Sequence, residues 1–316
     1  MIGYLVRRIL QALGLLLLVS VIGFGILHLA PGGPMAQFAA SGDLTPADFA
    51  RIEHQMGLDR ALPIQYGEWL WRLLSGAWGV SYRDQQPVLG IIASHLGATV
   101  ELMLTSMIAA ILLGCWIGVV SAVHRYGWFD TLATVGSMIT LSIPTFWFGF
   151  MMIYIFSVRL EWLPSGNLET IGDGSLLDHI HHLIAPAVVL ALASTASWSR
   201  YMRSSMLDVI NHDFVRTARA KGLPRQWILY RHIVRNALLP MITIAGLQLP
   251  ALLGGALVTE TVFTWPGMGR LFLDSISYRD YPVVMGVLIF TATLVLIGSL
   301  LADLCYGVAA PRISLR

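Results

Sequence analysis

The 316-residue sequence has few charged residues. Asp, Glu, Lys and Arg together make up 12% of it, about half the share found in an ordinary soluble domain. Hydrophobic residues make up 56%. A water-soluble chain of this length cannot hide so much apolar surface behind so few charges, which excludes disordered chains, collagen-like repeats and most soluble enzymes. The class that remains is a polytopic membrane protein.

Lysine and cysteine are also scarce. The one lysine, Lys221, stands between Ala220 and Gly222, so the chain lacks the Gly-Lys-Ser/Thr of a phosphate-binding loop and any ATP must bind another chain. Cys115 and Cys305 lie in apolar runs, which argues against disulfides and CxxC metal sites. The sequence has no HExxH or GxSxG motif of an intramembrane hydrolase, and nothing that resembles a channel filter. We therefore expect no catalytic, cofactor-binding or metal-binding residues in this chain.

Long apolar runs are abundant. About 20 helical residues cross the ~30 Å hydrocarbon layer of a membrane. Six runs are candidates, of which the fourth is the shortest: 9–29, 99–122, 131–157, 183–198, 237–263 and 281–308. Basic residues precede the first run as in a signal peptide, but the run is too long for one and no A-x-A cleavage site follows. We predict an all-α membrane protein with six transmembrane helices.

The positions of the basic residues predict the orientation. If the N-terminus is cytoplasmic, 13 of the 20 Lys and Arg residues fall on the cytoplasmic side, together with only a few acids. Both termini would then be cytoplasmic. The predicted organisation is an N-terminal helix (1–29), a folded external segment (30–97), a five-helix core (98–308) with a basic cytoplasmic loop (199–236), and a cytoplasmic tail (309–316). Trp and Tyr residues of the external segment are candidate interface anchors or contacts for an external protein.

The basic loop contains the most informative local pattern, DFVRTARAKGLPRQW from residue 213. Asp213 is a plausible N-cap for a helix over 214–221, Gly222 a left-handed stop, and Pro224 the start of a further helix. Such a helix could enter a groove of another protein, with small Ala218 and Ala220 allowing close approach. The same residues also fit a basic amphipathic turn that lies on anionic lipid.

DFVRTARAKGL and the following RHIVRNALLP resemble the coupling loop of ABC-transporter permeases in the dipeptide/oligopeptide/nickel family. The family motif is EAA, three residues, then Gly. Arg216, Thr217 and Ala218 take its first places and Gly222 its glycine, with arginine for glutamate as is usual in this subfamily. The resemblance covers almost the whole chain, through GLDRALPIQYGEWL, SIPTFWFG, WLPSGN, GLQLPALLGGALVTETVFTWPGMGRLF and RDYPVVMG, although Ala310 replaces the usual Asp before the closing proline.

This resemblance implies a type I ABC importer permease fold in a bacterial inner membrane. It implies import of di- or oligopeptides, with nickel or its chelates, glutathione or another small polar solute as alternatives. The implied partners are a second, non-identical permease, two cytoplasmic ATPases that bind ATP and Mg, and an external solute-binding protein, with no nucleic acid. The contact with the ATPase would use Arg216, Thr217, Ala218, Ala220, Lys221, Gly222 and Leu223.

Other residues have both a functional and a structural interpretation. Pro144 and Pro250 lie in mid-span and would serve as a hinge or gate, or merely kink a helix for packing. Glu260, at the end of the fifth run, would line the pathway or cap a helix near the interface, as would Glu101 and Asp303. A His-x-His-His cluster (179–182) in the loop before the fourth run has no accompanying cysteine, so we do not expect it to bind a metal.

Overall fold

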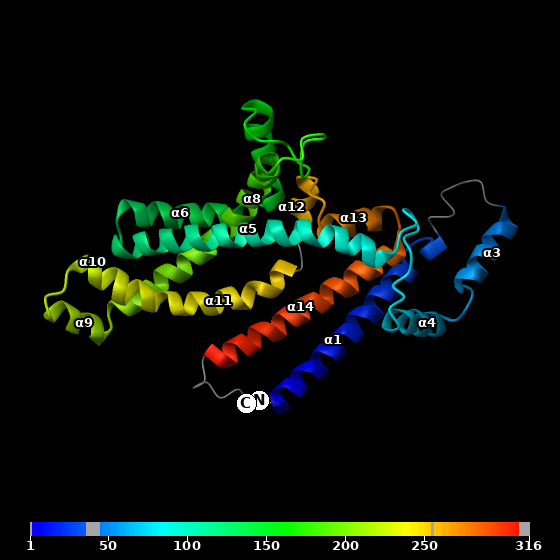
Figure 1. The fold of residues 1–316 in the computed structure, drawn as a ribbon, viewed down its shortest axis with the longest axis horizontal. Coiled ribbons are helices and arrows are strands. Elements are labelled where there is room, and N and C mark those ends of the chain that lie inside the picture. The colour runs from blue at the N-terminus through cyan, green and yellow to red at the C-terminus, as the bar shows by residue number, and fades with distance from the viewer. Residues whose placement is uncertain (1, 36–44, 254–255, 310–316) are drawn as a thin grey trace.

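The computed structural model describes residues 2–35, 45–253 and 256–309. Over these residues the regular structure is helical, and one isolated β-bridge joins Val80 to Pro87. Long helices lie side by side through the middle of the molecule, and short helices form its two ends (Figure 1). We call these the α9 end, formed by α9 and α10, and the α4 end, formed by α3 and α4. The predicted all-α class is confirmed for the described residues.

The helices before the core are α1 (Ile2–Leu29), η1 (Gly33–Met35), α3 (Pro46–Met56) and α4 (Leu62–Leu74). A capping box starts α3, because the Thr45 side chain accepts a bond from the Asp48 N–H and the Asp48 carboxylate accepts one from the Thr45 N–H. Gly57 ends α3 in the left-handed conformation, with φ +69°. The described residues of the segment after the first apolar run therefore form short helices.

The core begins with α5 (Val88–Val123), α6 (Trp128–Ser142), α7 (Thr145–Met152), the π-helix η2 (Ile153–Arg159) and α8 (Leu176–Ile210). It continues with α9 (Asp213–Ala220), α10 (Arg225–Trp227), the π-helix η3 (Ile228–Val234) and α11 (Arg235–Leu253). It closes with α12 (Leu257–Val262), α13 (Met268–Ser277) and α14 (Tyr281–Ala309).

Among the described residues, four helices are long and apolar enough to cross a membrane: Val6–Leu29, Val88–Val123, Leu176–Ile210 and Tyr281–Ala302. A fifth span results if the bent pair Trp128–Ser142 and Thr145–Arg159 is counted as one. The run 131–157 is thus not one straight helix, and the run 237–263 is divided between α11 and α12. The expected six spans therefore stay a prediction.

The fourth run differs most from expectation. It was predicted to span 183–198 and to be followed by a loop, but α8 extends over 35 residues and continues to Ile210. The first 12 residues of the predicted loop 199–236 are therefore helical. Polar residues such as Ser199 and Arg203 do not end α8, because they lie against α5 and α6 rather than in solvent. The histidines 179–182 also belong to α8 and not to a loop.

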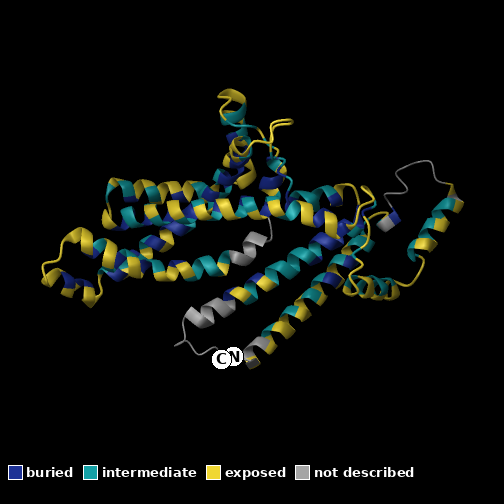
Figure 2. Cartoon of the chain, viewed as in Figure 1, coloured by how far each residue is buried: buried dark blue, intermediate teal, exposed yellow. Residues whose placement is uncertain are grey.

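The two longest described helices, α5 and α8, pack closely because α5 presents glycines to α8. A Cβ atom on Gly114 would lie 2.4 Å from Cβ of Trp198, and one on Gly118 would lie 2.6 Å from Cβ of Met202. Gly114 and Gly118 are four residues apart and so face the same side of α5. Buried residues in Figure 2 follow this contact, whereas α3, α4, α9 and α10 are largely exposed. A buried cluster around Trp198, Met202 and Met206 extends from it to α11 and η3.

α1 and α14 form a second close pair and, unlike α5 and α8, run antiparallel to each other. Gly23 of α1 faces Met285 and Leu288 of α14, and Arg8 donates a 3.0 Å hydrogen bond to Ser299. The first turns of α1 and the later turns of α14 therefore lie on the same side of the molecule (Figure 1).

Asp280, just before α14, connects the loop 75–87 to the core. It is buried and accepts hydrogen bonds from the Ser81 hydroxyl and from the backbone N–H groups of Tyr82 (3.1 Å) and Arg83 (3.5 Å). Burial, together with the neighbouring Asp280 carboxylate, raises the pKa of Tyr82 to about 12. The Tyr82 phenol is therefore neutral at physiological pH.

The α5–α8 contact predicts opposite effects for the same substitution at two glycines of α5. Gly118→Ala places a methyl group 2.7 Å from the Ser199 carbonyl oxygen, and overpacking of this kind costs about 1–3 kcal/mol. Gly97→Ala is the matched control, because nothing lies within 4 Å of its Cβ position and alanine favours a helix by about 0.5–1 kcal/mol. The midpoint temperature of thermal unfolding, measured on the purified protein in detergent, should fall for Gly118→Ala. It should stay level or rise for Gly97→Ala. Equal midpoints for the two variants would contradict the packing argument.

Candidate functional site

The helix predicted over 214–221 is present as α9, and it has two different faces. Val215 and Ala218 are 0% and 6% exposed and belong to the buried cluster that includes Met206, Ile228 and Ile233. The other face is exposed and carries Arg216, Thr217, Arg219 and Ala220. With apolar residues inward and basic residues outward, α9 is fixed to α8 and η3 while its outer surface stays accessible.

The end of α9 forms as the sequence predicted. Gly222 has φ +74°, the Leu223 N–H donates to the Ala218 carbonyl (3.4 Å), and the Gly222 N–H donates to the Arg219 carbonyl (3.0 Å). These two bonds form a Schellman motif, which satisfies carbonyls at the helix end and turns the chain sharply. Nothing lies within 4 Å of a Cβ on Gly222, so glycine is favoured here by its backbone conformation and not by space.

Two details of the predicted loop are wrong. His212, and not Asp213, is the N-cap of α9, and Asp213 is its first helical residue. Ala218 was expected to allow close approach to a partner, but its side chain is buried within this chain. Its small size instead lets α9 lie close to its own support. Ala220, Lys221 and Leu223 are exposed, as a contact with another chain requires.

Beyond Pro224 the chain continues through α10 into the π-helix η3, which leads directly into α11. Ile228 and Ile233 of η3 are 3% and 4% exposed and pack in the same cluster as α9. The Ser205 hydroxyl of α8 donates a 2.9 Å bond to the Ala237 carbonyl of α11. Wide π-turns within helices are frequent at functional sites. The segment η3 therefore links α9 mechanically to both α8 and α11.

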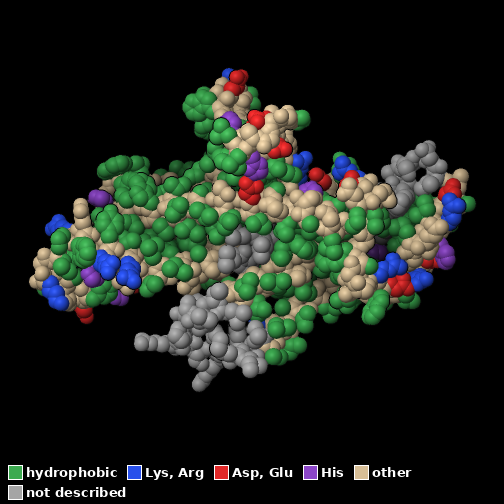
Figure 3. Space-filling view, in the orientation of Figure 1, with side chains coloured by type: hydrophobic (Ala, Val, Ile, Leu, Met, Phe, Trp, Pro, Cys, Tyr) green, Lys and Arg blue, Asp and Glu red, His purple; other side chains and the backbone are tan. Residues whose placement is uncertain are grey.

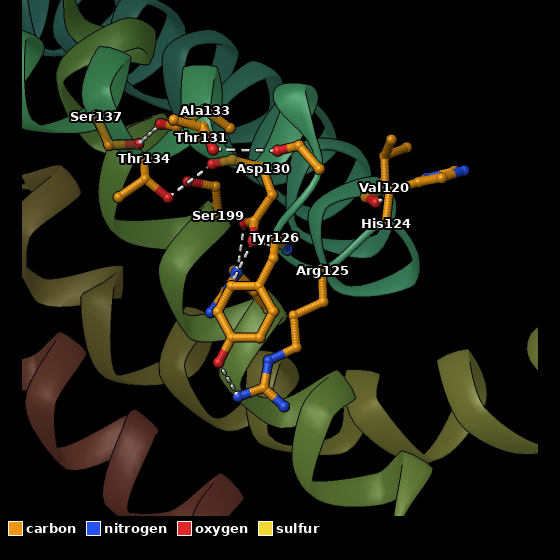
Figure 4. A network of polar contacts seen from close by, with 12 residues as sticks. Val120, His124, Arg125, Tyr126, Asp130, Thr131, Ala133, Thr134, Ser137 and Ser199 are labelled. Atoms are coloured by element: carbon orange, nitrogen blue, oxygen red, sulfur yellow. Dashed lines mark hydrogen bonds and ion pairs between the residues drawn. The ribbon is translucent and has the colours of Figure 1, made fainter.

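A partly buried ion pair lies two turns of α8 before α9. The Arg203 guanidinium donates two 2.7 Å hydrogen bonds to the Asp130 carboxylate, one from Nε and one from Nη2. Asp130, in the first turn of α6, is 4% exposed and also accepts a 2.9 Å bond from the backbone N–H of Tyr126. Figure 4 shows Asp130 within a network of polar contacts at the turn between α5 and α6. This bidentate geometry joins the α5–α6 turn to α8.

The surface of the α9 end is more strongly charged than the middle of the molecule. In Figure 3, Lys and Arg side chains gather over α9 and α10, while hydrophobic side chains cover most of the middle. Charged groups also gather over α3 and α4 at the opposite end. This distribution fits a protein whose middle lies in hydrocarbon and whose two ends face water.

Pro144 does not merely kink the third apolar run but divides it into two separate helices. Ile143 and Pro144 are extended, with ψ of 127° and 134°, and the helices on either side form an angle of 102°. Proline disfavours the helical conformation at the residue before it, and it lacks the N–H that a continuous helix would use. Pro250 has a different outcome, because α11 continues past it to Leu253. Whether either proline acts as a gate stays a prediction.

Glu260 lies on α12 and is completely buried. Its carboxylate accepts hydrogen bonds from the Thr99 hydroxyl (2.8 Å) and from the N–H groups of Gly269 (2.7 Å) and Arg270 (3.1 Å). A Cβ on Gly267 would lie 2.4 Å from the Glu260 carboxyl carbon, so glycine is needed for this approach. Glu260 thus holds α12, α5 and the first turn of α13 together. These contacts do not test the prediction that Glu260 lines the transport pathway.

Each of the three clustered histidines has a nearby hydrogen-bond partner. His179 Nε2 lies 2.7 Å from Glu101 Oε1, a pair that connects the start of α8 to α5. His181 Nε2 lies 2.6 Å from the Trp162 carbonyl oxygen, and His182 Nδ1 lies 2.9 Å from that of Asp178. These contacts fit structural roles for the three rings.

Sequence reasoning did not find the Asp130–Arg203 pair or the π-helix η3. One signal for the pair was available, since Asp130 is an isolated acid at the start of an apolar helix, on the arginine-rich side of the chain. Its partner lies 73 residues away, a separation over which helical periodicity gives no information. No sequence signal for the π-turns was recognised.

Comparison with known proteins agrees with this architecture. Residues 110–315 match the family described as the binding-protein-dependent transport system inner membrane component, and residues 1–103 match the family of the N-terminal part of such components. The chain belongs to this family, so it is a permease component of an ABC transport system and a multi-pass inner-membrane protein.

Relatives match it over nearly their whole length. The chain is 44% identical over 315 residues to the oligopeptide transport system permease protein AppB of Bacillus subtilis strain 168. It is 36% identical over 335 residues to the dipeptide transport system permease protein DppB of Escherichia coli K12. It is 40% identical over 314 residues to the glutathione transport system permease protein GsiC of Salmonella paratyphi A. Each alignment covers 99% of both chains. The resemblance stated from the sequence is confirmed.

The ion pair predicts a large penalty when one partner alone is removed. Arg203→Leu leaves the Asp130 carboxylate buried without its counter-ion. Breaking a fully buried pair costs about 3–5 kcal/mol, and somewhat less is expected here because the Arg203 side chain is 29% exposed. The double variant Asp130→Asn/Arg203→Leu should recover much of the loss, because no charge remains buried. Arg200→Leu, at an exposed arginine of α8, is the control. If Arg203→Leu and Arg200→Leu had the same midpoint temperature of thermal unfolding, the ion pair would not stabilise the protein.

Proposed function

We propose that this chain imports di- or oligopeptides delivered by an external solute-binding protein. The observation that carries the proposal is its full-length similarity to permeases named for oligopeptide and dipeptide transport. Glutathione is a second candidate, because a relative with 40% identity is named for it and because glutathione is itself a small peptide. Nickel or its chelates, and other small polar solutes, are the remaining alternatives.

The proposed assembly contains this chain, a second and non-identical permease, and two ATPases that bind ATP and Mg. The α9 end would face the cytoplasm, since Lys and Arg gather there, and both termini would be cytoplasmic. The six proposed spans are α1, α5, the bent pair of α6 with α7 and η2, α8, α11 together with α12, and α14. ATP hydrolysis would occur in the partner subunits, and this chain would carry out translocation.

The exposed face of α9 is the proposed contact with an ATPase. Arg216, Thr217, Ala220, Lys221 and Leu223 would form the contact, Ala218 would hold α9 against α8 and η3, and Gly222 would set the direction in which the chain leaves. When the ATPases close, α9 would move as a rigid body with α8 and α11, which η3 links. Pro144, Pro250 and Glu260 are the proposed hinge or pathway positions, because each lies at or near a break or junction between apolar helices.

Uptake measurements test the solute. In a strain that lacks only this gene, uptake of a labelled tripeptide at low external concentration should be lost, and labelled nickel uptake should be unchanged. Labelled glutathione is measured in parallel, and restoring the wild-type gene is the control. Loss of nickel uptake alone would replace the peptide proposal with a metal one, and loss of glutathione uptake alone would narrow it to that peptide.

Replacing either of two alanines of α9 with leucine tests the coupling contact, because Ala220 is exposed and Ala218 is buried. Ala220→Leu should leave thermal stability unchanged, because Ala220 is exposed, yet lower ATPase docking and uptake about tenfold if about 1.4 kcal/mol of docking free energy is lost. Ala218→Leu should lower thermal stability as well, because Ala218 is buried. The measurements are ATP-driven uptake and ATPase copurification in proteoliposomes of the assembled transporter. Normal uptake with Ala220→Leu would remove this face of α9 from the proposed contact.

A further inference from the structure

The helix α4, after the first apolar helix, has three distinct sides. Tyr66 and Trp69 face α1, and Gln65, Glu68 and Arg72 line a cavity of about 620 Å³ that α1, α3 and α14 also border. The third side carries Ile64, Trp71 and Leu74, which are 53%, 73% and 75% exposed. Spacings of seven and three residues place these three side chains on one face. That face is apolar, and no described part of the chain covers it.

Contacts with α1 place α4 at membrane depth. The Tyr66 hydroxyl lies 2.8 Å from the Ser20 hydroxyl, and the rings of Tyr66 and Trp69 pack against Phe24 at centroid distances of 5.5 and 5.9 Å. Ser20 lies nine residues before Leu29, the last residue of α1, which is about 13 Å along a helix axis. The part of α1 that α4 contacts therefore lies inside the apolar run and not beyond it.

The exposed side of α4 continues the lipid-facing surface of α1. Only 11% of the apolar window of α1 is buried, and the side chains of Leu17, Val21 and Ile26 are 49–63% exposed. In a multi-pass membrane protein, apolar side chains that the chain itself leaves exposed on a spanning helix face lipid or another membrane subunit, and we assign this surface of α1 to lipid. A helix that packs on the outer third of α1 with apolar side chains pointing away from it extends the same surface. Trp71 is also the residue type that concentrates at the boundary between acyl chains and headgroups.

We propose that α4 is an interfacial membrane helix, with Ile64, Trp71 and Leu74 inserted into the lipid leaflet at the C-terminal end of α1. The polar side of α4, with Glu68 and Arg72, faces the cavity. Amphipathic helices of this kind lie in the interface plane with the apolar face in the acyl boundary. The anchor fixes the height of the segment α3–α4 above the bilayer. This inference depends only on the membrane location of the chain and not on its solute.

Site-directed spin labelling tests the proposal in the complete transporter reconstituted in lipid nanodiscs. Cys115 and Cys305 are first replaced by serine, and retained uptake verifies that background. Single labels are then placed by Ile64→Cys and Leu74→Cys, with Leu17→Cys on α1 as the lipid-facing control and Arg51→Cys on α3 as the water-facing control. The probes are oxygen, which partitions into lipid, and a water-soluble nickel chelate.

Labels at positions 64 and 74 should collide more often with oxygen than with the nickel chelate, as the label at position 17 should. The label at position 51 should collide more often with the nickel chelate. Greater access for the nickel chelate at both sites would place this face in water and overturn the proposal. Protection of both sites from both probes would show that a protein partner covers the face, and this outcome would overturn it too.

Discussion

The close approach of α5 and α8 is the constraint on which the rest of the molecule depends. Gly114 and Gly118 remove the side chains that would separate the two helices, so that Trp198 and Met202 pack directly on the α5 backbone. In lipid, helices gain little from apolar burial alone, and such close packing supplies much of their attraction. The pair forms a long rigid unit, and nearly every short helix of the core is attached to one of its two ends.

At one end of this unit, α8 carries α9 and η3 and is tied to α6 through Arg203 and Asp130. Near the other end of α8, His179 contacts Glu101 of α5, and the Trp265 indole donates a 2.8 Å bond to the Ala98 carbonyl. Glu260 joins the same region through Thr99. A displacement of α9 would therefore reach α11 through η3, α6 through α8, and α5 through the tightly packed α5–α8 pair. These connections are consistent with the coupling role proposed for α9.

The buried carboxylates of the chain's described part are satisfied locally, as a membrane environment demands. Asp130 binds a guanidinium and a backbone N–H, and Glu260 binds a hydroxyl and two N–H groups. Asp280 does the same for the loop that precedes α5. Each of these three buried carboxylates joins segments that are distant in the sequence.

The sequence by itself determined the membrane class, the all-α fold and the stop of α9 at Gly222, because apolar run length and glycine at a left-handed position act within a few residues. It also carried the family motifs. Only the tertiary structure decided that Ala218 points inward and Ala220 outward, that α8 continues through Arg203, and that Pro144 turns the chain by 102°. The reason is physical: a local pattern fixes where a helix forms, whereas its rotation, its length beyond the apolar run and the partner of a buried charge depend on neighbours far away in the chain.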